Sequence, residues 1–225
     1  MSDHEKNTDP PVAPAAAATP EPPQDRHTAN RLIRELFILA ALWLPLGFFL
    51  WFFFGSFLIR PAVLVGNGVF ALFAPEVVSG LVQNGFQIDV NTPIRLERMV
   101  EGRFALLSFT INPLIYAYGV PLLFGLVMAT PRLSAGRRVA QILGGYLVLL
   151  LVQVWGIFWE ILKDMSFSYG SLAAGAVADT GIPLSVIALC YQLGYLILPA
   201  VVPIVLWILM NRPFLESIAL TRRRP

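Results

Sequence analysis

The stretch LFILAALWLPLGFFLWFFFGSFLI, residues 36–59, contains 24 residues without a charged side chain. An α-helix needs about 20 apolar residues to cross a hydrocarbon layer of ~30 Å. Three further apolar runs of similar length follow, at residues 111–130, 139–162 and 183–210. The sequence therefore predicts an all-α polytopic membrane protein with about four transmembrane helices.

The composition supports a membrane protein. Hydrophobic residues make up 56% of the chain and charged residues only 13%, with a mean hydropathy of +0.68. In a soluble protein of 225 residues, so few charges would not cover the surface. Membrane lipids are therefore expected partners.

The basic residues are distributed unevenly over the predicted loops. With four crossings, one side of the membrane holds 11 of the 16 lysines and arginines. These residues are Lys6, Arg26, Arg31, Arg34, Arg132, Arg137, Arg138, Arg212, Arg222, Arg223 and Arg224. The positive-inside rule then predicts that both termini are cytoplasmic. We interpret the arginines of the basic tail, residues 216–225, as topology determinants and lipid contacts, not as a nucleic-acid site.

The segments outside the spans differ in character. Residues 1–30 are rich in proline and alanine, carry no apolar periodicity, and predict a disordered cytoplasmic tail. Residues 31–215 form the predicted transmembrane domain, with an insertion at residues 60–110 on the outer, periplasmic side. Within the second outer loop, residues 171–178 predict a short helix.

The insertion changes its periodicity along its length. Its first part, residues 61–82, predicts a helix that lies along or dips into the outer leaflet. Its second part alternates apolar and polar residues from Phe86 onward, and Glu101-Gly102 marks a hairpin between two strand patterns. A helical bundle has no evident packing need for such strands. The hairpin is therefore a candidate docking surface for a partner.

The candidate partner-binding residues carry charge. Arg95, Glu97, Arg98 and Arg103 lie on the predicted hairpin, where mixed charges are also typical of a solvated strand face. Glu160, near the outer end of the third span, is the fifth candidate, because ionisable groups within spans are often functional. An interfacial ion pair with Lys163, three residues later, is the simpler interpretation of Glu160.

Prolines and aromatic residues predict the shape of two spans. Pro121 removes a backbone donor and predicts a kink in the second span, whose Tyr116 is expected at the wet outer interface. Pro199 and Pro203 predict a bent or locally loosened fourth span.

The inventory of reactive residues argues against an enzyme. The chain has one cysteine, Cys190, and two histidines, His4 and His27, both in the N-terminal tail. We therefore predict no catalytic, cofactor-binding or metal site. The alternative is a small membrane transporter or lipid-handling enzyme, which would need a polar cavity at the membrane midplane.

Three stretches resemble a known family. NPLIYAYGVPLL (112–123), QVWGIFWEILKDM (153–165) and YQLGYLILPAVVPIVLWILMNRPFL (191–215) resemble the exosortase H-associated membrane proteins. The resemblance implies a bacterial inner-membrane accessory factor encoded with a sorting transpeptidase of the exosortase type, its expected protein partner. It carries over no site residues.

Overall fold

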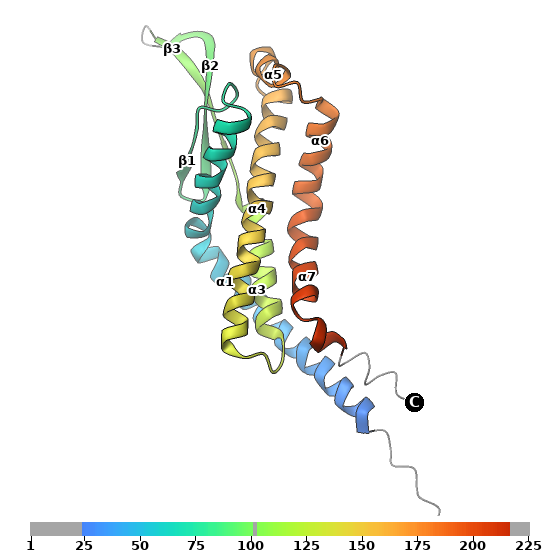
Figure 1. The fold of residues 1–225 in the computed structure, drawn as a ribbon. Coiled ribbons are helices and arrows are strands. Elements are labelled where there is room, and N and C mark those ends of the chain that lie inside the picture. Colours follow the sequence, from blue (N-terminus) through green and yellow to red (C-terminus); the bar gives the residue numbers. More distant parts are fainter. Residues whose placement is uncertain (1–23, 101–102, 217–225) are drawn as a thin grey trace, which may run out of the picture.

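The computed structural model describes residues 24–100 and 103–216. Figure 1 shows a bundle of helices with a small sheet beside its upper half. The elements in chain order are α1 (Gln24–Phe73), β1 (Gly80–Asn84), β2 (Gln87–Val100), β3 (Arg103–Ile111), α2 (Leu114–Ala117), α3 (Gly119–Ala129), α4 (Ala135–Phe167), α5 (Ser171–Ala178), α6 (Leu184–Gln192), the π-helical turn η1 (Leu193–Ile197) and α7 (Leu198–Met210).

Three of the described helices are long and apolar enough to cross a membrane: Asn30–Phe73, Ala135–Phe167 and Leu184–Met210. The second predicted span, residues 111–130, is a shorter apolar helix, Leu114–Ala129. It is shorter because Ile111 still belongs to β3. Pro121 cannot donate to the Ala117 carbonyl, and the helix is interrupted at this point between α2 and α3. The polytopic helical fold is confirmed.

Helix α1 is longer at both ends than the sequence predicts. It begins at Gln24, so residues 24–30 are helical although they were assigned to the disordered tail; residues 1–23 lie outside the described part of the chain. At its other end α1 continues through Pro61 to Phe73. The expected separate helix along the outer leaflet is therefore wrong: this segment prolongs the span and rises beside the sheet (Figure 1).

The sheet is antiparallel, with strand order β1-β2-β3. Val100 pairs with Arg103 on either side of residues 101–102, which confirms the predicted hairpin. Strand β1 was not predicted, because Leu81 and Val82 continue an apolar run and were assigned to the preceding helix. Asn84 pairs with Gln87 and joins β1 to β2 through a second tight turn.

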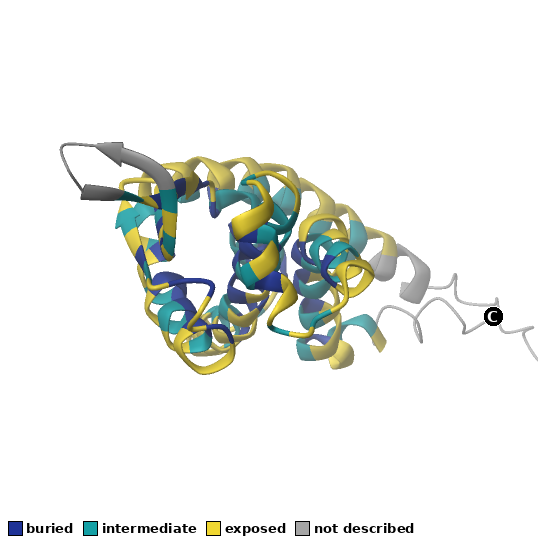
Figure 2. Cartoon of the chain, turned by 90° about the horizontal axis from the view of Figure 1, so that it is seen from above, coloured by how far each residue is buried: buried dark blue, intermediate teal, exposed yellow. Residues whose placement is uncertain are grey.

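The inner face of the sheet is part of the main hydrophobic core. Its buried residues pack in one cluster with buried residues of α1, α4 and α5. Figure 2 shows buried positions gathered on the inner sides of the helices and strands. The buried apolar strand residues are Leu81, Ile88, Val90, Leu107, Phe109 and Ile111. The expectation that the strands serve no packing purpose is therefore wrong. Helix α4 has 33 residues and is about 50 Å long, so it extends beyond a ~30 Å hydrocarbon layer and the sheet covers part of the excess.

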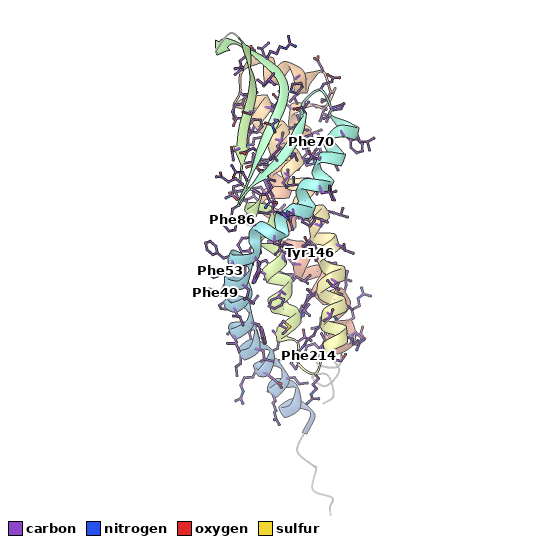
Figure 3. The ribbon with its side chains drawn as sticks, turned by 90° about the vertical axis from the view of Figure 1, so that its left-hand side faces the viewer. Phe49, Phe53, Phe70, Phe86, Tyr146 and Phe214 are labelled. Atoms are coloured by element: carbon purple, nitrogen blue, oxygen red, sulfur yellow. The ribbon has the colours of Figure 1, made fainter. Side chains whose placement is uncertain are left out.

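The turn between β1 and β2 lies beside the exposed aromatic residues of α1. Phe86, in the turn between β1 and β2, stacks on Phe52 with 6.2 Å between ring centroids. Figure 3 shows Phe86 directly above Phe53 and Phe49 along α1. This turn therefore lies at the edge of the apolar band of the protein.

The last span has the loosened geometry that its prolines predict. The helix changes to a π-turn over Leu193–Ile197 just before Pro199.

The short helix predicted in the second outer loop, at Ser171–Ala178, is also present, as α5.

Candidate functional site

One outer edge of the sheet, along β1, is closed by a side chain of α1. The Asn67 amide Nδ2 donates to the Leu81 carbonyl at 2.9 Å, and the Leu81 N–H donates to Asn67 Oδ1 at 2.7 Å. The same Nδ2 also donates to the Val63 carbonyl at 3.1 Å. At Leu81, Asn67 thus supplies both hydrogen bonds that a neighbouring strand would supply, and the Gln83 side chain donates to the Ser56 carbonyl of α1. These contacts with α1 obstruct the addition of another strand to β1.

The opposite edge, along β3, has no strand neighbour among the described residues. In an antiparallel ladder, alternate residues direct their backbone groups toward the partner strand. The Thr92 hydroxyl donates to the Leu107 carbonyl at 2.8 Å, so Leu107 faces β2. Ser108 and Thr110 therefore present their backbone N–H and C=O groups at the open edge. Such unpaired groups are a template for strand addition.

The predicted charged residues of the hairpin are only partly described. Arg95 is exposed and lies opposite Leu106, which is itself 57% exposed. Glu97, Arg98 and Arg103 belong to the strand ends next to the hairpin turn, but their side chains lie outside the described part of the structure. By backbone position, these four residues lie in the part of β2 and β3 that leads into the hairpin turn.

Glu160 does not join them, and its predicted ion pair is wrong. The Lys163 ammonium instead pairs with the adjacent Asp164 carboxylate. It also lies 4.6 Å from the centroid of the Tyr191 ring. The Lys163 ammonium is therefore engaged by Asp164 and Tyr191 and forms no ion pair with Glu160.

Glu160 instead forms a buried polar cluster with Tyr116 between α2 and α4, and Gln153, which is also buried, lies two turns earlier on α4. Tyr116 is only 1% exposed, so its expected place at the wet interface is wrong. Glu160 Oε2, the Tyr116 hydroxyl and Gln153 Nε2 are all buried and find no hydrogen-bond partner in the described structure. The Tyr116 hydroxyl and the Glu160 carboxyl nevertheless lie close enough to interact electrostatically.

A glycine makes room for the Tyr116 ring in this cluster. A Cβ atom on Gly156 would lie 2.1 Å from Tyr116 Cδ1, well inside van der Waals contact. The π-turn packs on the same part of α4: a Cβ atom on Gly194 would lie 3.3 Å from Gly156 Cα. Trp155 Nε1 also donates to the Cys190 carbonyl at 3.1 Å. The cluster is therefore held between three helical segments.

Glu160 was identified as a candidate from the sequence, but its contact with Tyr116 was missed. Tyr116 is 44 residues from Glu160, and no local pattern connects the two.

Substituting Glu160 tests the cluster. We expect Glu160→Ala to lower the stability of the folded protein by about 1–3 kcal/mol, because the buried Tyr116 hydroxyl then loses its favourable electrostatic interaction with the Glu160 carboxyl. Glu160→Gln keeps a polar group of the same shape, so it should lower the stability of the folded protein by less than Glu160→Ala does. Thermal unfolding of the detergent-purified variants measures the difference; equal stability of Glu160→Ala and the parent protein would contradict the cluster.

A cavity of about 350 Å³ lies between α1, α3 and α4. Its lining is apolar apart from the Trp51 indole and the Tyr146 hydroxyl, and the latter donates to the Leu58 carbonyl at 3.3 Å. An aqueous transport pathway would need a polar lining, so this cavity gives no support to a transporter. Among the described residues, no group of three histidine, cysteine or acidic side chains is placed to hold a metal ion.

The sequence was compared with known protein families, with curated proteins and with solved structures. Residues 30–214 match the family described as exosortase H-associated membrane protein. Comparisons with curated proteins and with solved structures gave no match. The matched segment contains the sheet, the polar cluster and all the candidate spans. The chain therefore belongs to the family of exosortase H-associated membrane proteins.

Proposed function

We propose that this protein is a non-catalytic accessory subunit of an exosortase-type protein-sorting system. In this proposal it lies in the bacterial inner membrane with both termini in the cytoplasm. Its outer sheet then docks or supports the sorting transpeptidase. The family name supports the link to an exosortase, and the excess of arginines in the predicted inner loops supports the orientation.

The open edge of β3 is the observation that carries the docking role. Of the two edge strands, β1 is blocked at Leu81 by Asn67 of α1, whereas Ser108 and Thr110 of β3 keep free backbone groups. An extended segment of another chain that adds to β3 would gain main-chain hydrogen bonds. Arg95 and the other charged residues at the end of the hairpin would then contribute to the choice of partner.

The non-catalytic part of the proposal is supported by the residue inventory. Both histidines lie at positions 4 and 27, far in sequence from the buried cluster. Cys190 donates no side-chain hydrogen bond to a base among the described contacts, and its carbonyl accepts from Trp155. Glu160 and Tyr116 form a polar contact without an accompanying nucleophile.

Ser108→Pro tests the docking role directly. Proline removes the N–H that Ser108 presents at the open edge and is tolerated on edge strands, so the ladder to β2 should persist. We expect crosslinking of the β3 region to the transpeptidase to fall at least fivefold in membranes. Processing of proteins that carry the sorting signal should fall in parallel.

Ser108→Ala is the matched control, because it keeps the backbone N–H and removes only the exposed hydroxyl. It should crosslink and process like the parent protein. Normal crosslinking by Ser108→Pro, at an unchanged protein level, would refute docking through β3. The fold itself would remain as described.

A further inference from the structure

A second cavity, of about 140 Å³, lies at the opposite end of the bundle from the sheet. Here α3 ends, α4 begins and α7 ends, and Arg132 and Arg137 line the cavity together with Met210, Asn211 and Phe214. The wall between α4 and α7 is held by reciprocal amide bonds: Gln141 Nε2 donates to Asn211 Oδ1 at 3.1 Å, and Asn211 Nδ2 donates to Gln141 Oε1 at 3.2 Å.

The positive charge at this cavity is not neutralised by carboxylates. No carboxylate lines the cavity, and the acidic residue nearest to the lining in sequence, Glu216, is exposed and forms no ion pair within the described part of the chain. Among the described residues, neither Arg132 nor Arg137 forms an ion pair. The neighbouring Arg138 donates to the Thr130 carbonyl at 3.2 Å, and its buried Nε has no acceptor in the described structure.

The helix that begins here adds to the attraction for an anion. Helix α4 has 33 residues and starts at Ala135, and Ser134 makes no side-chain cap to its first amides. The N-terminus of a long helix carries partial positive charge and free N–H groups, which favour phosphate. Arg137 projects from this first turn.

The position of the cavity at the ends of two apolar helices indicates which kind of anion it would bind. Ala129 and Met210, the last residues of α3 and α7, end apolar runs that lie within the bundle. The cavity follows these ends directly, and its lining also includes Leu133 and Pro213. A site with arginines beside apolar side chains at the end of membrane-spanning helices suits a phosphate that carries acyl chains.

We propose that this cavity binds the phosphate of an anionic phospholipid, held by Arg132 and Arg137 at the start of α4. The headgroup phosphate lies against the guanidinium groups and the first amides of α4, and the acyl chains continue along the apolar ends of α3 and α7. The proposal does not depend on the partner or on the docking role of the sheet.

Binding to lipid nanodiscs tests the site with the full chain. We expect the parent protein to unfold at a higher temperature in phosphatidylglycerol-containing nanodiscs than in phosphatidylcholine nanodiscs, and to retain phosphatidylglycerol in native mass spectrometry. Arg132→Gln combined with Arg137→Gln should weaken phosphatidylglycerol binding at least roughly tenfold, since a direct hydrogen bond from a guanidinium group to a phosphate contributes about tenfold or more. The paired Arg→Lys variant keeps the charges and should keep most of the binding.

The matched control is Arg31→Gln combined with Arg34→Gln. These arginines are exposed on α1 at a separate position, beside Glu35. This control should keep the phosphatidylglycerol effect. An equal loss in both glutamine pairs would overturn the proposal in favour of diffuse surface attraction, as would absence of any phosphatidylglycerol effect in the parent protein. Equal stabilisation by inorganic phosphate in phosphatidylcholine nanodiscs would assign the site to free phosphate and overturn the lipid assignment.

Discussion

Replacing Gly156 with alanine is expected to lower the stability of the folded bundle by about 1–3 kcal/mol, the usual cost of overpacking a close contact. The added Cβ would lie 2.1 Å from Tyr116 Cδ1 and 2.3 Å from Cγ, atoms near the base of the ring that cannot move without shifting α2. Chemical or thermal unfolding of the detergent-purified protein measures the loss.

Gly144→Ala, on the same helix, is the matched control. A Cβ at Gly144 meets no atom within 4 Å, so alanine should be neutral or stabilising through its better helix propensity. Combining Gly156→Ala with Tyr116→Ala should remove the steric part of the penalty, giving a strongly non-additive cycle. Equal stability of the Gly156 and Gly144 variants would contradict the close packing of α2 on α4.

Replacing Asn67 with alanine is also expected to have a large effect: it should lower the free energy of unfolding by about 2–4 kcal/mol. The Leu81 N–H and C=O would lose both partners while Leu81 itself stays 4% exposed, and each unpaired buried group costs about 1–3 kcal/mol. Faster hydrogen exchange of the β1 amides, together with a lower unfolding temperature, would report this loss.

The same substitution opens the β1 edge. An unpaired edge strand tends to associate with other chains, so Asn67→Ala should also form oligomers during size-exclusion chromatography. Ser79→Ala is the control, because the Ser79 hydroxyl donates to the Asn91 carbonyl at an exposed position and its loss should be mild. Unchanged exchange in β1 after Asn67→Ala would show that the side chain does not close this edge.

Several elements were predictable from the sequence because their causes are local. The length of each uncharged apolar run determines whether it can cross a hydrocarbon layer, and alternation from Phe86 onward with a turn at Glu101-Gly102 predicts a hairpin. Prolines predict where helices loosen because they remove a donor from their own helix. The membrane class, the hairpin and the π-turn before Pro199 follow from such local effects.

The tertiary structure alone decided which groups meet. Asn67 closes β1 from 14 residues away, and Tyr116 reaches Glu160 across 44 residues of sequence. Neither pairing has a periodic signal, because it depends on how two helices and a sheet approach one another. The physical reason is that hydrophobicity and turn chemistry are properties of single segments. The satisfaction of a buried polar group, and the choice of the sheet edge that stays open, are properties of the packed assembly.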